Sequence, residues 1–373
     1  MRFEKVIGQN DLKKKLLQEV ENQKISHARI FFGEPGYGSL ALALAFAQYI
    51  LCEEKQEDDS CGVCLTCRQV EKLQHPDLHF SFPTVQSVSK VSNGLLPDWR
   101  AQIEESAYFS PFDWIKKIDP KEDKPKPIIS VHESDAIQKK LRLKSYQGGY
   151  KILIMWLPET MKLECANKIL KILEEPPEKT LFILVSSNVD ALPDTIRSRC
   201  QILQLHRIES KLIEAHLKTT FNMDEQRCQS ITAFSEGNLL KAYEITQSSD
   251  NDGELKDAFI EMMRLSYKKN VIEMINWSNA MAKKGRERQK IFLTYTLHML
   301  RQCIIKNYSG ERLVQVSKEE AAFIERFSPF VSGKNIREFM KAFNEAYYQL
   351  ERNANSKILF TLLCFQSMRF LHK

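Results

Sequence analysis

The chain has 373 residues, of which 43% are hydrophobic and 27% charged, and its formal net charge is +6. This composition is that of a globular protein of about two or three domains, and it excludes a fully disordered chain. A charge of this size permits contact with nucleic acid without arguing for it. The longest uncharged apolar run, residues 39–52, is shorter than the roughly 20 residues that span a bilayer, and the N-terminus has no apolar signal segment. We therefore expect a cytoplasmic protein without membrane contact.

Short apolar runs alternate with helical patterns over the first 205 residues. Gly, Pro or polar residues bound each apolar run, and the segments between repeat apolar residues at helical spacing. Strands that alternate with helices indicate a mainly parallel sheet covered on both faces. The predicted strands are 28–32, 78–82, 151–157, 180–186 and 201–205, and the predicted helices include 10–22, 39–51, 130–145 and 159–173.

The first strand runs into the sequence FFGEPGYGSLALALA, residues 31–45. It has the strand, glycine-rich turn and helix of a phosphate-binding loop, whose pattern is G-x-x-x-x-G-K-[ST]. Gly33, Gly36 and Gly38 are in register, but Ser39 and Leu40 stand where the ATP-binding Lys and the Ser or Thr belong. The loop can still offer backbone N–H groups to an anion. The residues thus leave open whether a nucleotide binds unproductively.

Four cysteines follow the helix of this loop: Cys52, Cys61, Cys64 and Cys67, with the spacing C-x8-C-x2-C-x2-C. Such a density is unusual in a cytosolic chain, where disulfides are rare. Zinc binds four thiolates in a tetrahedron, and a C-x2-C turn presents two sulfurs together. Because all four ligands are cysteines, we predict a structural rather than a catalytic zinc within residues 52–67. Four unrelated thiols are the alternative.

Residues 84–127 interrupt the alternation of strands and helices. They contain Trp99 and Trp114 and end in the charged run DPKEDKPKP, and their periodicity is too weak for a helix or strand to be assigned. We interpret the segment as an insertion that ends in an exposed linker, with aromatic residues that argue against full disorder. The sequence assigns it no role.

The third predicted strand, in KILIMWLPETM, is where a phosphate-loop ATPase places the acids that hold magnesium. Trp156, Leu157 and Pro158 follow KILIM, and the next acid, Glu159, comes late. We interpret Glu159 as a carboxylate that stabilises a helix N-terminus. Because the Lys, the Ser or Thr and the acids are all missing, we predict that the chain does not hydrolyse ATP and that ATP is not its cofactor.

The fourth predicted strand leads into SSNVDALPDTIRSRC. Ser187 and Asn188 follow its carboxyl end, where ligands bind in open α/β sheets. The sequence RSRC, residues 197–200, comes next. An arginine on the rim of such a domain can reach the γ-phosphate held by a neighbouring subunit. The alternative is a surface arginine in a salt bridge.

The predicted strands end at about residue 205. A small helical segment covers 206–250, and residues 251–373 contain four glycines and one proline, with apolar residues at helical spacing. We therefore predict a small helical domain followed by an all-helical one.

Several stretches, taken in order, carry a resemblance to one protein family. They are VIGQ (6–9), SHARIFFGEPGYG (26–38), the four-cysteine module, HPDLHF (75–80), GGYKILI (148–154), ANKILKILEEPP (166–177) and TIRSRC (195–200). On these residues the chain resembles the delta-prime subunits of bacterial DNA polymerase III clamp loaders, which are AAA+ proteins. The match covers about residues 1–205 and is thin beyond them. The insertion at 84–127 departs from the family.

This resemblance implies a fold with three parts. Residues 1–205 would form an α/β AAA+ domain with a RecA-like parallel sheet and helices on both faces. Residues 206–250 would form a small helical lid, and residues 251–373 an all-α collar through which subunits assemble. The implied function is that of a stator, a subunit without ATPase activity against which the motor subunits move.

The resemblance also implies a role for the RSRC sequence. Arg199 would be the finger for ATP bound in an adjacent motor subunit, positioned by Ser198, with Cys200 packed behind it. Leu240 stands where AAA+ proteins place the Arg of a Gly-x-x-Arg pattern, a further sign of a silent site. The implied partners are the motor (gamma/tau) and delta subunits, the sliding clamp through the assembled loader, and primer–template DNA.

Two other interpretations compete with this one. An ATP-hydrolysing motor subunit or helicase loader on the same fold would bind ATP tightly, and the missing Lys and acids argue against it. A zinc-dependent nucleic-acid-binding protein would use the cysteine module to contact DNA. The module is flanked by acidic residues that would repel phosphate, namely Glu53, Glu54, Glu57, Asp58 and Asp59.

Overall fold

The computed structural model describes residues 1–120, 127–247, 252–309, 314, 316, 318–352 and 354–373. The described chain divides into two compact units, residues 1–213 with 237–240 and residues 214–236 with 241–373. Most of the predicted charged linker, residues 121–126, lies outside the described residues. The domain boundaries predicted at 205 and 250 stay predictions.

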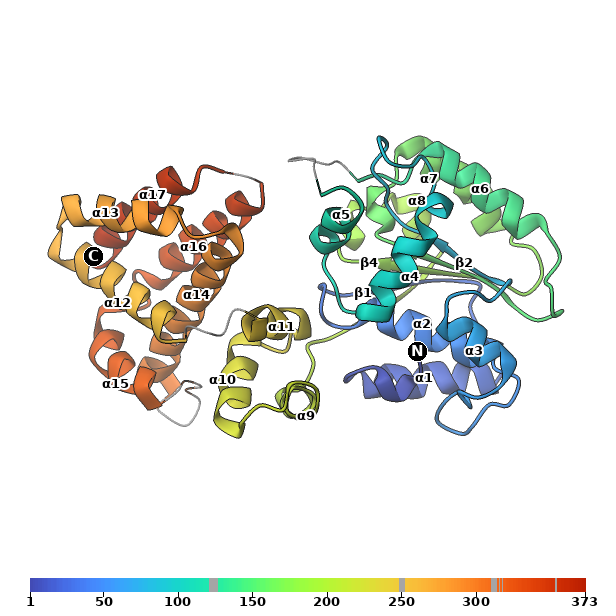
Figure 1. The fold of residues 1–373 in the computed structure, drawn as a ribbon, viewed down its shortest axis with the longest axis horizontal. Coiled ribbons are helices and arrows are strands. Elements are labelled where there is room, and N and C mark those ends of the chain that lie inside the picture. The colour runs from blue at the N-terminus through green and yellow to red at the C-terminus, as the bar shows by residue number, and fades with distance from the viewer. Residues whose placement is uncertain (121–126, 248–251, 310–313, 315, 317, 353) are drawn as a thin grey trace. The chain divides into compact units, whose positions relative to one another are not determined.

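The first unit is built on a five-stranded parallel sheet with the strand order β2-β3-β4-β1-β5 (Figure 1). The strand that carries the glycine-rich loop, β1, therefore lies between β4 and β5. This arrangement, with helices on both faces, confirms the predicted α/β AAA+ class. The strands are β1 (Ala28–Phe32), β2 (Leu78–Ser81), β3 (Lys151–Trp156), β4 (Thr180–Ser186) and β5 (Gln201–Gln204).

Helices cover both faces of this sheet. Figure 1 shows α6 (Val131–Arg142) and α7 (Leu163–Glu174) on one side, with α1 (Asn10–Glu21) and α2 (Ser39–Leu51) on the other. Every residue of β3 and β4 is buried as a result. Strands that are buried on both faces need continuous apolar sequence, and KILIMW and TLFILVS provide it.

The insertion is helical, although its sequence did not allow a helix to be assigned. It contains the 3-10 helix η2 (Ser92–Leu95) and two α-helices, α4 (Leu96–Glu105) and α5 (Pro111–Ile118). At 10 and 8 residues, α4 and α5 are too short for helical periodicity to be read reliably. Their tryptophans, Trp99 and Trp114, are fully buried.

The first unit also contains several shorter helices. They are η1 (Phe3–Lys5), α3 (Leu65–Glu71), η3 (Pro158–Thr160), η4 (Val189–Ala191) and α8 (Asp194–Arg197).

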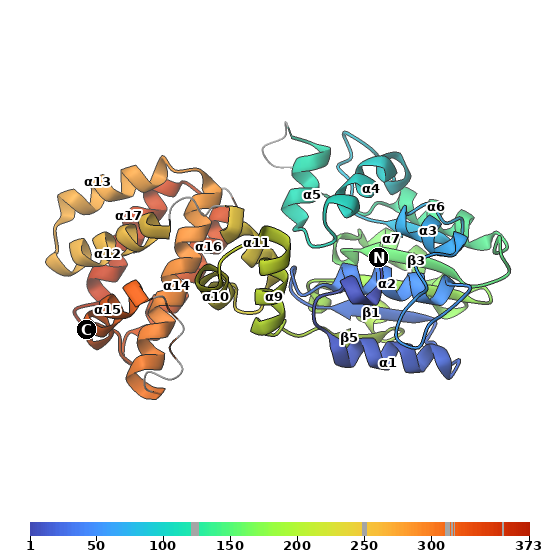
Figure 2. The same cartoon turned by 60° about the horizontal axis from the view of Figure 1, so that its bottom comes forward.

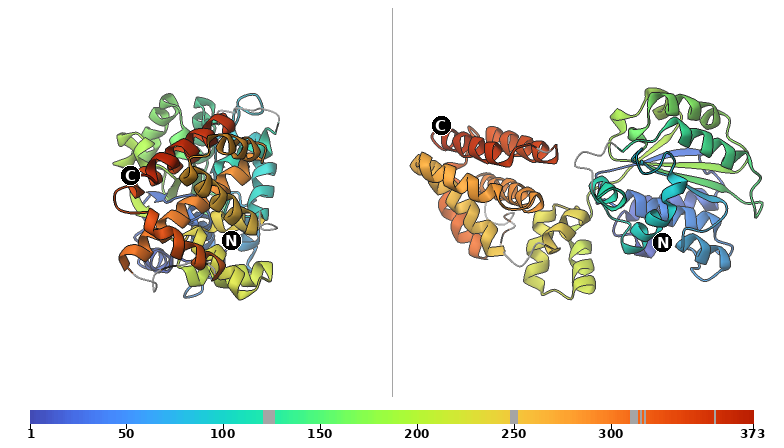
Figure 3. Two further views of the ribbon diagram at one scale, coloured as in Figure 1. Left: turned by 90° about the vertical axis from the view of Figure 1, so that its left-hand side faces the viewer. Right: turned by 45° about the horizontal axis from the view of Figure 1, so that its top comes forward.

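The rest of the described chain is helical, as predicted (Figures 2 and 3). In the second unit, α14 packs on α16 and α17 packs on α12, α13 and α16. Fully buried phenylalanines form much of its core: Phe259, Phe292, Phe339, Phe343 and Phe360. The helices are α9 (Ser210–Phe221), α10 (Glu225–Ser235), α11 (Leu239–Gln247), α12 (Asp252–Lys268), α13 (Val271–Ala282), α14 (Arg286–Ser309), α15 (Lys318–Phe327), η6 (Ser328–Phe330), α16 (Ile336–Glu351) and α17 (Ser356–Phe370). Within the described residues, no helix is both long and apolar enough to cross a membrane.

Candidate functional site

The glycine-rich loop keeps the backbone of a phosphate loop. It leads from the end of β1 to Ser39, the first residue of α2. Gly36 and Gly38 have φ angles of 99° and 91°, in the left-handed region that glycine adopts without steric cost. The N–H of Gly33 donates to the carbonyl of Ser186 at the end of β4. The three predicted glycines thus form one turn at the carboxyl edge of the sheet.

A second segment closes tightly on this turn. The side-chain amide of Asn238 donates to the carbonyl of Pro35 at 2.7 Å, and the N–H of Leu239 donates to the carbonyl of Gly36 at 3.2 Å. A Cβ atom built on Gly36 would lie only 1.9 Å from Oδ1 of Asn238 and 2.9 Å from Cβ of Leu240. Leu240, in place of the expected arginine, therefore packs on the loop and offers no charge to a phosphate.

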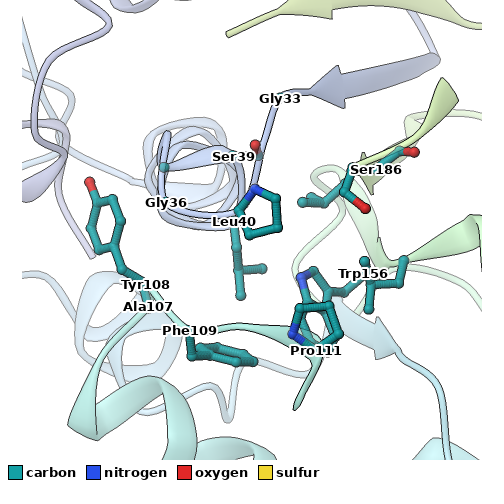
Figure 4. Close-up of a pocket in the computed structure, with 15 residues that line it drawn as sticks. Gly33, Gly36, Ser39, Leu40, Ala107, Tyr108, Phe109, Pro111, Trp156 and Ser186 are labelled. Atoms are coloured by element: carbon teal, nitrogen blue, oxygen red, sulfur yellow. The ribbon is translucent and has the colours of Figure 1, made fainter. Parts of the chain in front are cut away.

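The positions that would handle ATP are buried and uncharged. Ser39, Leu40 and Trp156 are only 8%, 5% and 5% exposed. Figure 4 shows Leu40, Trp156 and Phe109 around one small cavity at the mouth of the loop. None of the described residues that line this cavity is charged. The lining supplies neither a cation for a triphosphate nor a carboxylate for magnesium.

Glu159 has a different role from the one predicted. It lies in η3, and α7 begins only at Leu163, so it does not stabilise the N-terminus of that helix. One carboxylate oxygen accepts hydrogen bonds from the N–H and the hydroxyl of Ser187, at 2.9 and 2.7 Å. Glu159 therefore ties η3 to the end of β4.

Arg199 lies just after α8 at the edge of the sheet domain, with its side chain 36% exposed. Its guanidinium donates to the carbonyl of Thr195 at 2.8 Å and to the hydroxyl of Ser198 at 3.3 Å. It also lies 2.5 Å from a carboxylate oxygen of Glu174, at the end of α7. The structure thus brings Ser198 and Arg199 together and adds Glu174, which the sequence analysis did not single out.

Arg197 and Cys200, close to Arg199 in the sequence, make contacts within their own domain. Arg197 forms ion pairs with Asp190 and Asp194. Cys200 packs against the apolar cluster beneath α7 and α8, and burial raises the pKa of its thiol to about 11. A protonated, partly buried thiol is a packing group rather than a nucleophile.

The four predicted cysteines converge on one point. Their sulfur atoms all lie within 4.8 Å of one another, and those of Cys61 and Cys67 are 3.9 Å apart. A tetrahedron with zinc–sulfur bonds of about 2.3 Å has sulfur atoms about 3.8 Å apart. The donor set and its spacing therefore fit a metal ion. The nine cysteines, all within the described residues, form no disulfide.

Backbone N–H groups support this cluster. The N–H groups of Cys61, Cys64 and Cys67 donate to the sulfurs of Cys52, Cys61 and Cys64, respectively, at 3.3 to 3.4 Å. The N–H of Cys64 is the largest cause that lowers the pKa of Cys61 to about 7. Burial raises the pKa of Cys52 and of Cys67. Such N–H···S bonds stabilise thiolates, the form that binds a metal.

Two carboxylates, one in the cysteine module and one in the HPD sequence that follows it, accept hydrogen bonds from distant parts of the sheet domain. Asp59 accepts hydrogen bonds from the N–H groups of Phe3 and Glu4, both at 3.0 Å. Asp77, in the HPD sequence, accepts from the N–H of Tyr146 at 2.9 Å and from the hydroxyl of Ser145 at 3.1 Å. The module therefore braces the N-terminus, and the HPD sequence holds the loop that precedes β3.

Comparison with known proteins agrees with these features. The family described as "DNA polymerase III, delta subunit" matches residues 8–209, more than half of the chain. The chain belongs to this family. It is 29% identical over 204 residues to DNA polymerase III subunit delta' of Bacillus subtilis, a match that covers 55% of this chain and 49% of the relative. It is 27% identical to subunit delta' of Escherichia coli over 190 residues, which are 50% of this chain and 45% of the relative.

Relatives of another kind match as well. DNA polymerase III subunit tau of Bacillus subtilis is 22% identical over 393 residues, a match that covers the whole of this chain and 62% of the relative. The chain thus spans about half to three fifths of the length of these relatives. The matches therefore establish the family but include both delta-prime and motor-type subunits. The residues of the nucleotide site are what distinguish these two types.

Solved structures with some likeness include a DNA polymerase III gamma subunit-related protein of Thermotoga maritima. It is 13% identical, with a TM-score of 0.38 over 96% of this chain and 99% of that one. The RuvB Holliday junction branch migration motor of the same organism is 14% identical, with a TM-score of 0.38 over 69% of this chain and 65% of that one.

Proposed function

We propose that this chain is a non-hydrolysing, delta-prime-type subunit of a DNA polymerase III clamp loader. The observation that carries the proposal is a pairing of two features. The phosphate loop keeps its backbone, but Ser39, Leu40 and, at the end of β3, Trp156 are buried and uncharged where an ATPase has its ATP- and magnesium-binding residues. Arg199, by contrast, stays partly exposed at the domain edge. A subunit that does not hydrolyse ATP but presents an arginine can still assist hydrolysis of ATP bound to a neighbouring subunit.

Arg199 is the proposed finger. Its fork of N–H donors suits a phosphate, and the bonds to Thr195 and Ser198 fix the direction of its side chain. Ser198 is the positioning residue. An arginine finger typically contributes a factor of about 10³ to 10⁵ to the rate of phosphoryl transfer. This gain would appear in the ATPase of the neighbouring motor subunit, not in this chain.

The cysteine cluster is proposed to hold a structural zinc through Cys52, Cys61, Cys64 and Cys67. Four thiolates fill a tetrahedron and leave no open position for a substrate. Residues 206–250 are proposed as the small helical lid, and residues 251–373 as the collar through which the chain joins the motor (gamma/tau) and delta subunits. Through that assembly the chain would act on the sliding clamp and on primer–template DNA.

The isolated chain provides the first test. We expect no measurable ATPase and no saturable binding of fluorescent ATP at concentrations that saturate a motor subunit assayed in parallel. Tight ATP binding with turnover would contradict the proposal and favour the alternative, an ATP-hydrolysing motor subunit or helicase loader.

The same preparation separates the proposal from a zinc-dependent nucleic-acid-binding protein. Chelation of the metal should lower the thermal stability of the chain. If chelation instead abolished tight DNA binding by the isolated chain while the fold stayed intact, the cysteine module would be a nucleic-acid site and the proposal would fail.

A further inference from the structure

The insertion reaches the mouth of the phosphate loop. Residues 107–109, between α4 and α5, and Pro111, the first residue of α5, line the same small cavity as the loop and the ends of β3 and β4 (Figure 4). Tyr108 and Phe109 are 8% and 7% exposed. They are buried beside the glycine-rich loop, whose backbone N–H groups hold the phosphates of a nucleotide in an active phosphate loop.

Tyr108 packs directly over the loop. A Cβ atom on Gly38 would lie 3.1 Å from both Cε1 and the hydroxyl oxygen of Tyr108, so the ring covers the last glycine before α2. The same hydroxyl accepts a hydrogen bond from the N–H of Ile7 at 3.0 Å. The position of the Tyr108 ring is thus fixed by packing on Gly38 and by the hydrogen bond from Ile7.

Phe109 packs on Trp156, which stands where a phosphate-loop ATPase has magnesium-binding acids. Its ring centroid lies 4.9 Å from that of Trp156, at the end of β3. Trp156 also lies 5.3 Å from Trp99 of α4, and Trp99 lies 5.2 Å from Trp114 of α5. One aromatic cluster therefore joins both helices of the insertion to the carboxyl edge of the sheet.

Hydrogen bonds fix the segment between the two helices. The hydroxyl of Ser106 accepts from the N–H of Tyr108 at 3.0 Å and donates to the carbonyl of the same residue at 3.1 Å. Ser110 and Asp113 form a capping box at the start of α5. The indole N–H of Trp114 donates to the carbonyl of Pro83 at 2.9 Å. The aromatic side chains are thus presented by a defined backbone.

The space left over is small. The cavity between the loop and the segment is about 40 Å³, room for a few water molecules, since one buried water needs roughly 10–15 Å³. This space is much smaller than a triphosphate group, and Tyr108 and Phe109 form one side of it.

We propose that residues 107–111 act as an intramolecular plug of the nucleotide site. The plug excludes nucleotide by occupying the place of its phosphates, and this exclusion is separate from the loss of the Lys and the acids. The proposal also gives the insertion a role. Trp156 and Leu40 then form the apolar surface against which the plug packs. This inference concerns the chain alone and does not depend on its assembly into a clamp loader.

A two-part variant series tests the plug in the full chain. The first variant repairs the loop with Ser39→Lys and Leu40→Thr. The second adds Tyr108→Ala and Phe109→Ala, which open the plug. The matched control adds Phe112→Ala instead, because Phe112 is 52% exposed and is not among the cavity-lining residues. The probe is fluorescent N-methylanthraniloyl-ADP, titrated to equilibrium with each folded variant.

The proposal predicts that the opened variant binds this probe at least tenfold more tightly than the repaired variant and the Phe112→Ala control. Equal affinities for all three, whether measurable or not, would overturn it.

A second measurement needs no repaired loop. In the natural chain, the plug should protect the backbone amides of residues 36–42 from hydrogen exchange. The double variant Tyr108→Ala and Phe109→Ala should raise their exchange rates at least tenfold, while Phe112→Ala should leave them unchanged. Unchanged rates in the double variant would likewise contradict the plug.

Discussion

The guanidinium of Arg199 lies 2.5 Å from a carboxylate oxygen of Glu174, so the proposed finger is paired within its own chain. Glu174 ends the helix of the LKILEEPP sequence, and Arg199 belongs to the SRC sequence that follows β4. The two stretches that carry the family resemblance most specifically are therefore in contact. To reach a phosphate on a neighbouring subunit, Arg199 must exchange this carboxylate for it.

Glu174→Gln should free Arg199 without harming the fold. Both side chains are more than a third exposed, and such a pair contributes about 0–1 kcal/mol to stability. We expect the free energy of unfolding to change by less than about 1 kcal/mol and the ATPase of the assembled loader to stay level or rise up to a few-fold. Glu175→Gln, at the next exposed position, is the control. A tenfold fall in loader ATPase with Glu174→Gln alone would show that Glu174 assists the finger instead of holding it back.

Metal content tests the cysteine cluster. The purified chain should contain one zinc ion, and Cys67→Ser should remove it because one of four ligands is lost. Loss of zinc should also lower the thermal unfolding temperature by at least about 5 °C, since each kcal/mol is worth roughly 2–4 °C in a domain of this size. Cys200→Ser, outside the cluster, should retain the metal in elemental analysis. Retention of zinc by Cys67→Ser would exclude the four-thiolate site.

The aromatic cluster should contribute strongly to stability. Trp99 is fully buried and stacks on Phe82 with ring centroids 4.3 Å apart. Trp99→Ala should cost about 3–5 kcal/mol, the usual range for a large buried aromatic residue. Urea unfolding followed by circular dichroism measures the loss. Phe112→Ala, on the exposed face of the same insertion, should cost less than about 1 kcal/mol. A small effect of Trp99→Ala would mean that the insertion does not pack on the sheet as described.

Stability should fall in mild acid because of His79 on β2. Burial, helped by the charge of Lys140, lowers the pKa of His79 from 6.5 to about 4. Between these values the unfolded chain binds a proton that the folded chain does not, so acidification favours unfolding. By pH 5 the loss should be about 2 kcal/mol. Urea midpoints at pH 7.5 and 5.0 measure it, and His79→Gln should reduce the difference whereas His132→Gln, at an exposed position, should not. An unchanged difference in His79→Gln would remove His79 as the cause.

The sheet domain was predictable because its signals are local. β1 and β4 match their predictions to the residue, and β2, β3 and β5 each end one residue earlier than predicted. Buried parallel strands are continuous apolar runs bounded by turn residues, which makes them visible in the sequence. The clustering of the four cysteines could likewise be predicted, because a C-x2-C spacing by itself brings two sulfurs together.

Other features depend on contacts between distant segments. Tyr108 and Phe109 have no local periodicity that points to the loop at Gly38, some 70 residues earlier in the sequence; only the dense aromatic run AYFSPFDW hinted at a buried role. Glu174 was visible within a family sequence, but its pairing with Arg199 follows from the packing of α7 on α8. Glu159 was wrongly placed at the N-terminus of the following helix, because it lies in η3 and α7 begins only at Leu163.

The most direct test of the central claim uses the reconstituted clamp loader, with motor and delta subunits from the same source. Its ATPase, stimulated by clamp and primer–template DNA, is measured with the natural chain, with Arg199→Ala and with Arg197→Ala as the matched control. We predict that Arg199→Ala lowers the stimulated ATPase at least tenfold while the complex still assembles, and that Arg197→Ala has little effect. Full ATPase with Arg199→Ala in an intact complex would show that this chain does not supply a finger to its neighbour.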